Sequence, residues 1–348
     1  MLSDDAAEAV VEAPRPAEEG LFGDFEVDEG DGDGERDSSY GGEVESITTS
    51  ISDSAIDYKF EHGRRYHAFQ DGKYHLPNDD EEIVRLELQH LIWRQCLSNR
   101  LHLCPTPNPL RTVLDIGCGT GAWAIDFAEV HPATRVIGVD LSPIQPTAVP
   151  PNVEFLVDDI TAPWIFDQPF DYIHSRAITI GVRDWGALVA EVWRNLAPGG
   201  WVEFQEYHAP FVSDDGTIAR CAAFERWNGL LLEAAGKAGV RLDAIVGVPG
   251  VLAERGFVNV GRAATKWPVG PWAKGQREKR LGEMVLDDVA GGLEGFSMRM
   301  FTKVLGWSRE EVMELLEQVS LDMRSGKMHA YLPIDFLWAQ KPLDATEE

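Results

Sequence analysis

The sequence predicts an α/β protein built on a seven-stranded, mostly parallel sheet with helices on both faces. Short apolar runs alternate with segments of helical periodicity from about residue 111 to residue 342 of the 348-residue chain, as expected for strand–helix–strand units. The first run, residues 113–116, leads into a turn rich in glycine, and a second, residues 135–139, ends in Asp140. A strand, a glycine turn, a helix and an acid in this order are typical of a nucleotide-binding sheet.

The glycine-rich turn contains Gly117, Gly119 and Gly121. Residues without Cβ let the backbone turn sharply and approach a ligand closely. The spacing of Gly117, Gly119 and Ala122 also satisfies the dinucleotide fingerprint, so that a dehydrogenase is an alternative. Asp115 argues against that alternative, because a carboxylate at the end of the strand would repel a pyrophosphate.

S-adenosylmethionine carries no phosphate, and its amino and sulfonium groups are cationic, so a carboxylate at position 115 favours it. Residues 113–121 resemble motif I of the class I S-adenosylmethionine-dependent methyltransferases. The resemblance implies a Rossmann-like methyltransferase fold with S-adenosylmethionine as the cofactor. We therefore predict that Asp115, Gly117, Gly119 and Gly121 bind the cofactor.

Two further positions are predicted to contact the nucleoside. Asp140 falls 23 residues after Gly117, where an α/β nucleotide site places a carboxylate on the ribose hydroxyls. After a predicted strand at residues 153–157, the methyltransferase class has an acid that accepts from the adenine amino group and a backbone N–H that reaches the ring. The resemblance assigns these roles to Asp159 and Ile160, and the alternative is that Asp159 caps a helix.

Residues 1–55 differ in composition from the rest and are predicted to be a disordered acidic tail. Residues 1–57 carry 18 acidic residues against two arginines, a net charge of −16 out of −27 for the whole chain. High charge with few apolar residues favours disorder. The remainder is acidic as well, which argues against nucleic acid as a partner.

Residues 56–110 are predicted to form an N-terminal lid and a helix. Aromatic and basic residues are dense at 56–76, and the helix begins after Asn78 or Asp79, with a glutamate three residues on. Tyr66 and Arg65 either pack over the bound cofactor or cover the edge of the sheet. The apolar residues predicted to face the core from this helix are Ile83, Leu86, Leu91, Trp93 and Leu97.

Two segments resemble the LaeA-like methyltransferases of fungi. One is the lid with its Arg-Tyr-His at residues 65–67, and the other is Asp-Leu-Ser-Pro-Ile-Gln-Pro at residues 140–146. The resemblance covers about residues 57–342. The prolines of the second segment also leave little room for a full crossover helix.

Further strands are predicted at residues 170–174, 201–208, 257–265 and 328–338, with helices after Asp184 and at 217–238. His174 and His208 end two of these strands, where they would face the crevice. They are the candidate general bases, although methyl transfer does not require one. The alternative for each histidine is a positioning or structural role.

Residues 111–342 are predicted to form the methyltransferase domain, with a helical cap insertion at about 268–327 and a short tail at 343–348. Because the last two strands of this fold form an antiparallel hairpin, the insertion is expected over the substrate side. Its Met and aromatic residues either line an apolar pocket or form the core of the insertion. They are Trp272, Met284, Phe296, Met298 and Met300.

The four cysteines form no C-x-x-C pair and no evident ligand cluster with histidines, so we expect reduced thiols and no metal. No apolar run approaches membrane-spanning length, and the chain starts without a signal-peptide pattern. We therefore expect a protein of the cytoplasm that does not associate with membranes, with the nucleus as a further location.

The function predicted from the sequence is methyl transfer from S-adenosylmethionine to a small-molecule acceptor in fungal secondary metabolism. The alternative is a LaeA-like regulatory methyltransferase that acts through protein partners on secondary-metabolite gene expression. A dehydrogenase is disfavoured by Asp115 and by the lack of a recognisable hydride-transfer site.

Overall fold

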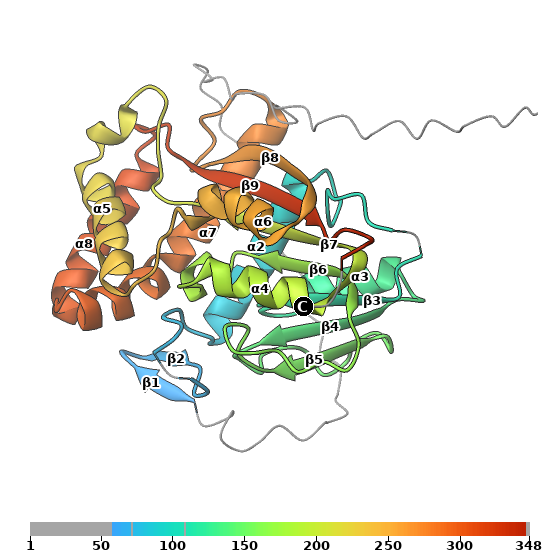
Figure 1. Cartoon of the computed structure of the whole chain (residues 1–348). Helices are drawn as coiled ribbons and strands as arrows, with labels where there is room; N and C mark the ends of the chain where they lie inside the picture. The colour runs from blue at the N-terminus through green and yellow to red at the C-terminus, as the bar shows by residue number, and fades with distance from the viewer. Residues whose placement is uncertain (1–57, 71, 108, 346–348) are drawn as a thin grey trace, which may run out of the picture.

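The computed structural model describes residues 58–70, 72–107 and 109–345. The predicted acidic tail, residues 1–55, lies outside them. The predicted seven-stranded sheet is confirmed, with the strand order β5-β4-β3-β6-β7-β9-β8 (Figure 1). The strands are β3 (Thr112–Ile116), β4 (Arg135–Asp140), β5 (Val153–Val157), β6 (Phe170–Arg176), β7 (Leu196–Tyr207), β8 (Val258–Pro268) and β9 (Tyr331–Gln340). Only β9 runs antiparallel to its neighbours, so the sheet is mostly parallel.

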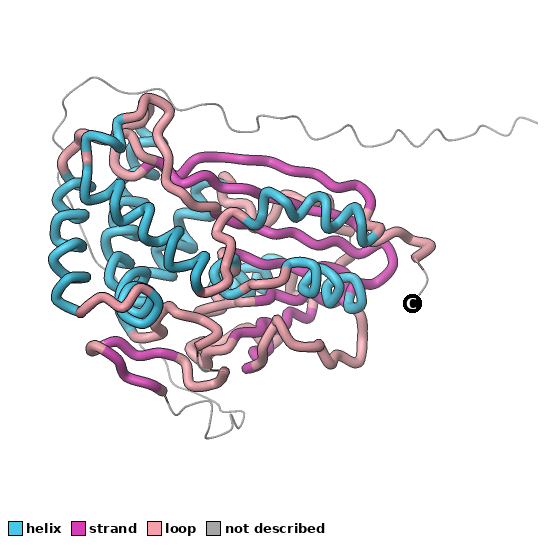
Figure 2. Tube along the Cα trace, turned by 60° about the vertical axis from the view of Figure 1, so that its left-hand side comes forward, coloured by secondary structure: helices cyan, strands magenta, loops and turns pink. Residues whose placement is uncertain are grey.

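Two apolar cores lie on opposite faces of the sheet, because side chains alternate along each strand. Val113 packs in one core with α2, α3, α5, α7 and α8, and Leu114 packs in the other with α4 and α6. These helices are α2 (Asp80–Cys96), α3 (Ala122–Val130), α4 (Trp185–Asn195), α5 (Ala222–Lys237), α6 (Val248–Arg255), α7 (Gln276–Arg299) and α8 (Arg309–Arg324). Short helical turns are η1 (Thr179–Gly181), η2 (Thr217–Arg220), η3 (Ala244–Gly247) and η4 (Met300–Val304). Figure 2 shows most of the helical mass at one end of the strands.

The connection from β4 to β5 and the start of β7 can be compared with the elements predicted from the sequence. No helix joins β4 to β5, as the prolines at residues 143–151 predict. Residues 198–200, Pro-Gly-Gly, lie inside β7 rather than before it, since β7 begins at Leu196 and pairs with Phe170 across an irregular register. The predicted start of this strand at residue 201 was therefore too late.

The segment between β8 and β9 contains α7, η4 and α8. Ser308 and Glu311 form the predicted capping box at the start of α8. Met298 and Met300 are buried in the larger core, and Phe296 packs against it. Met284 also packs against this core, whereas Trp272 is half-buried and donates to the Ala330 carbonyl at 3.0 Å. None of the five residues lines the cavity described below, and four of them fit the alternative of an insertion core.

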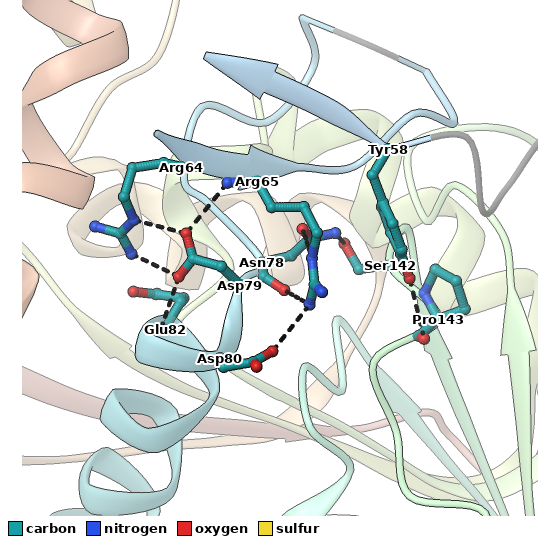
Figure 3. A network of polar contacts seen from close by, with 9 residues as sticks. All are labelled: Tyr58, Arg64, Arg65, Asn78, Asp79, Asp80, Glu82, Ser142 and Pro143. Carbon is teal, nitrogen blue, oxygen red and sulfur yellow. Dashed lines mark hydrogen bonds and ion pairs between the residues drawn. The ribbon is translucent and has the colours of Figure 1, made fainter. Parts of the chain in front are cut away.

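The N-terminal hairpin of β1 (Lys59–Glu61) and β2 (Arg64–Tyr66) is a separate sheet fixed by Asp79. The Asp79 carboxylate accepts from Arg64 Nε at 2.6 Å and Nη2 at 2.8 Å, and from the backbone N–H of Arg65 at 3.2 Å (Figure 3). It also accepts from the Glu82 N–H at 3.1 Å, as the N-cap of α2. One carboxylate therefore joins the hairpin to the first turn of α2.

We expect Asp79→Ala to lower the free energy of unfolding by roughly 2–4 kcal/mol, because it removes a helix cap and leaves a buried arginine without its partner. Urea titration checks this value. The matched control is Asp80→Ala, because the Asp80 side chain is 94% exposed and its loss is expected to change stability by no more than about 0.5 kcal/mol.

The effect of Asp79→Ala also depends on pH. Burial raises the pKa of Asp79, but hydrogen bonds from Arg64, Glu82 and Arg65 outweigh it and hold the pKa below its usual value. The ionised carboxylate thus stabilises the fold above the unfolded-state pKa of about 4, and this contribution is lost as the pH falls further. A gap between wild type and variant that stays constant down to about pH 2 would contradict the ion pair.

Candidate active site

A cavity of about 160 Å³ lies where β3, β4 and β6 end, beneath α2 and the segment Lys73–Asn78. It is lined by six of the eight predicted cofactor-binding residues. These are Asp115, Gly117, Gly119, Asp140, Asp159 and Ile160. His174 lines it as well, whereas Tyr66, Gly121 and His208 do not.

The glycine turn has a backbone that other residues rarely adopt. Gly117 and Gly121 have φ values of 68° and 80°. A Cβ on Gly117 would lie 2.5 Å from the Ile178 side chain, and one on Gly121 would lie 2.3 Å from the Phe155 ring. Gly121 is therefore needed for the turn and for packing at the start of α3, which explains why it does not reach the cavity.

Asp140 ends β4 and fixes the glycine turn. Its Oδ2 accepts from the Gly119 N–H at 2.9 Å and its Oδ1 from the Ser142 N–H at 2.9 Å. Burial raises the pKa of Asp140 to about 6 despite these two bonds. A carboxylate oxygen has more than one acceptor position, so the group is still able to bind ligand hydroxyls.

Asp159 is bonded to the N-terminal segment. Its Oδ1 accepts from the backbone N–H and the hydroxyl of Thr161, and its Oδ2 forms an ion pair with Lys73. The neighbouring Ile160 also lines the cavity, and its carbonyl accepts from the Trp164 indole at 2.9 Å. The acceptor predicted to receive the adenine amino group is thus occupied by the Lys73 ammonium.

Asp115 and His174 form a buried pair on adjacent strands. His174 Nδ1 lies 2.7 Å from Asp115 Oδ1, and the imidazole stacks on Trp123 with ring centroids 3.7 Å apart. Burial raises the pKa of Asp115 to about 7 and lowers that of His174 well below its usual value. His174 is 0% exposed, so this geometry favours the positioning role over that of a base.

The structure does not bring Tyr66 and His208 to the cavity. Tyr66 is fully buried beneath Arg299, whose guanidinium carbon lies 4.1 Å from the centre of the ring. His208 Nδ1 lies 2.8 Å from Asp335 Oδ2 on β9. The predicted roles of Tyr66 in cofactor binding and of His208 as a base have no support here, because tertiary contacts hold both side chains elsewhere.

Polar residues of α2 form a wall of the cavity that the sequence analysis missed. They are Glu82, Arg85, Gln89 and His90. Arg85 is 6% exposed and bonds Glu82 at 2.6 Å and Asp288 of α7 at 2.8 Å. Leu91, predicted to be buried, is 55% exposed, so part of the predicted apolar face is wrong. Glu82, Arg85 and Gln89 are three and four positions apart, and this spacing is the signal that would have indicated one helix face.

Among the described residues, one group of potential metal ligands forms, contrary to the expectation from the cysteines. Ligand atoms of His102, Cys104 and Glu203 lie within 4.8 Å of one another. Glu203 accepts from the backbone N–H groups of Leu103 and Cys104, and burial raises the pKa of the Cys104 thiol well above its usual value. Through these hydrogen bonds Glu203 fixes the segment before β3 to β7.

Comparison with known proteins gives matches to methyltransferases. A family model described as a methyltransferase domain matches residues 88–245. Methyltransferase pytC of Aspergillus terreus (strain NIH 2624 / FGSC A1156) is 38% identical over 301 residues, which cover 86% of this chain and 93% of the relative. The chain belongs to the LaeA-like class I methyltransferases. Its cofactor is therefore S-adenosylmethionine.

Two further relatives of this LaeA-like methyltransferase come from Emericella nidulans (strain FGSC A4 / ATCC 38163 / CBS 112.46 / NRRL 194 / M139). Probable methyltransferase tdiE is 31% identical over 304 residues, covering 86% of this chain and 94% of the relative. Protein-methionine methyltransferase laeA is 32% identical over 291 residues, covering 81% and 76%. Among the helices that the structure describes, none has the length and apolar character to cross a bilayer.

The affinity of the methyltransferase for S-adenosylmethionine is expected to rise at least about tenfold from about pH 5 to about pH 8. The free protein binds protons at Asp140 and Asp115, whose pKa values are about 6 and about 7. The cationic cofactor and its ribose donors favour the ionised forms of both carboxyl groups. Below these pKa values the protein must therefore lose protons when it binds the cofactor, and this cost lowers the affinity as the pH falls. Calorimetry at several pH values measures the effect, and a pH-independent affinity would contradict it.

Lys73→Met is expected to strengthen the binding of S-adenosylmethionine about 2- to 5-fold, since it frees the Asp159 oxygen from a half-exposed ion pair. The control is Lys237→Met, which removes an exposed ion pair with Glu233 outside the cavity and should leave affinity unchanged. Weaker binding by Lys73→Met would show that the lysine contributes to the complex.

Proposed function

We propose that this methyltransferase transfers a methyl group to a small-molecule acceptor in fungal secondary metabolism. The observation that supports the proposal is that one cavity is lined both by the predicted cofactor residues and by a second set of polar side chains. The second set comes from α2 and from the ends of β6 and β7, and includes Arg85, Gln89, Arg176 and Tyr207. A walled cavity of this kind suits a small acceptor.

In the proposed complex, Asp140 accepts from the ribose hydroxyls, and Asp159 and the Ile160 N–H contact the adenine. Asp115 faces the cationic amino acid end, with its carboxylate oriented by His174. Bound S-adenosylmethionine supplies a methyl group on a sulfonium that is already a good leaving group. The remaining task of the protein is to hold the acceptor in line with that methyl group, so orientation supplies much of the rate.

The insertion is rich in Met and aromatic residues, and such a composition alone would favour an apolar acceptor. None of its five Met and aromatic residues named above lines the cavity, and the acceptor side of the cavity carries charged residues instead, among them Arg85, Glu82 and Arg176. A polar or ionisable acceptor fits these charges better, because a buried charge is stabilised by a polar partner.

A regulatory methyltransferase with protein partners is the second candidate. The laeA relative is named a protein-methionine methyltransferase, and its identity to this chain is similar to that of tdiE. In this case the acceptor is a protein side chain, and the protein is expected in the nucleus as well as in the cytoplasm.

Methyl-tritiated S-adenosylmethionine added to the protein and an extract of its source organism is expected to label an organic-extractable small molecule. Asp140→Ala should abolish most of the incorporation, because binding weakens at least about tenfold when a charged hydrogen-bond acceptor is lost. Asp140→Asn keeps one acceptor oxygen and should therefore lose less of the label incorporation than Asp140→Ala. Glu154→Ala is the control, since Glu154 lies on β5 and its loss removes only an exposed ion pair with Arg135 of β4.

The fraction that carries the label separates the two candidates. Label confined to precipitable protein would refute the small-molecule proposal and favour the regulatory one. His174→Ala and His208→Ala are assayed in parallel. Turnover lost in either variant, with cofactor binding intact, would identify a base, whereas we expect that His208→Ala remains active.

A further inference from the structure

Arg176, the last residue of β6, lines the cavity, and no carboxylate among the described residues forms an ion pair with it. Its Nε donates to Gln205 Oε1 at 2.9 Å, and its Nη1 lies 3.1 Å from His90 Nδ1. Its Nη2 is buried and has no hydrogen-bond partner in the part of the chain that the structure describes. The guanidinium carbon lies 5.4 Å from the ring centre of Trp93, which is itself fully buried.

Three arginines are more deeply buried than Arg176 in the described residues, and each of them bonds a carboxylate. The pairs are Arg64 with Asp79, Arg85 with Glu82 and Asp288, and Arg299 with Glu61. A buried cation is stable when such a partner offsets its desolvation. Arg176 departs from this pattern at the wall of the cavity.

The two acceptors of Arg176 are both neutral. His90 Nε2 lies 2.9 Å from Asp126 Oδ2, so the ring donates from Nε2 to Asp126 and accepts at Nδ1 from Arg176. Gln205 is an uncharged amide. Burial lowers the pKa of Arg176 to about 10, against the opposing field of Asp115, and the group remains a cation at neutral pH.

Arg176 and Asp115 present opposite charges to the same cavity. Asp115 is paired in register with His174, and Arg176 is two residues further along β6, so its side chain leaves the same face of the sheet. The two side chains form no ion pair with each other among the contacts of the described residues. A carboxylate and a guanidinium that face one cavity without pairing with each other match a ligand region with a cation and an anion close together.

We propose that Arg176 binds a carboxylate or a similarly delocalised oxyanion in the cavity. Two sources have this chemistry: the methionyl carboxylate of S-adenosylmethionine, whose ammonium group then faces Asp115, and a carboxylate or enolate on the acceptor. The proposal rests on the function proposed above, because it uses the same cavity. Arg176 acts here by binding and orienting, with no covalent step.

The first experiment compares S-adenosylmethionine with its decarboxylated form, which lacks only the carboxylate, by calorimetry. If the cofactor is the source, wild type binds S-adenosylmethionine about 10- to 100-fold more tightly than the decarboxylated form. In Arg176→Gln this preference falls to within about twofold, and the affinity for the decarboxylated form is unchanged. Arg135→Gln, at an exposed ion pair on β4, keeps the preference.

The second experiment examines the acceptor, with benzoate as the probe and the protein saturated with S-adenosylhomocysteine. If the acceptor is the source, wild type binds benzoate but not the neutral isostere benzamide. Arg176→Gln then loses benzoate binding while its affinity for S-adenosylmethionine stays at the wild-type value. Ligand-observed nuclear magnetic resonance detects this weak binding.

The proposal is overturned if Arg176→Gln keeps both the preference for the carboxylated cofactor and the benzoate response of wild type, or if wild type shows neither. Should Arg176→Gln fail to fold, Arg176→Lys decides, since an ammonium cannot replace a bidentate guanidinium. The proposal is supported if Arg176→Lys lowers the preference for S-adenosylmethionine over its decarboxylated form, or for benzoate over benzamide, by at least about fivefold. It is overturned if both preferences stay at the wild-type values. Failure of wild type to bind S-adenosylmethionine at all would instead refute the cofactor site.

Discussion

The position of α2 depends on the Asp79 carboxylate, which receives N–H groups from the hairpin and from the first turn of the helix. The neighbouring Asn78 adds a buried hydrogen bond to Ser142 in the turn after Asp140. The N-terminal segment, the helix and the turn after β4 are therefore held relative to one another by polar contacts (Figure 3). This constraint places the polar face of α2 opposite the strand ends, so that a cavity forms between them.

The cavity collects charges that burial makes costly. Burial raises the pKa of Asp115 and Asp140, and burial lowers the pKa of His174 and Arg176. A ligand that carries cationic and anionic groups offsets part of this cost, because it replaces lost water with charged partners. The same reasoning explains why a cation is tolerated at the end of β6 without a protein carboxylate.

The sequence alone predicts those features that depend on residues close to one another in the chain. Strand runs, the glycine turn, the absence of a helix after Asp140 and the Ser308 cap all follow from neighbours in the chain, and the structure contains each of them. The errors concern orientation. Tyr66 lies under Arg299, and Leu91 points to solvent, because contacts with residues far along the chain decide which way these side chains face. Single-sequence periodicity does not contain that information.

The place of β9 has a consequence for the order in which the protein is made. Among the described strands of this sheet β9 is synthesised last, yet it lies between β7 and β8 and is the partner through which β8 joins the sheet. Until the ribosome releases residues 331–340, β7 and β8 both present open edges, which are sites for pairing with other chains. The ion pair of Glu61 with Arg299 adds a second dependence of early residues on late ones. The nascent chain therefore acquires its complete sheet only after residues 331–340 are synthesised, and a product that stops before β9 is expected to aggregate.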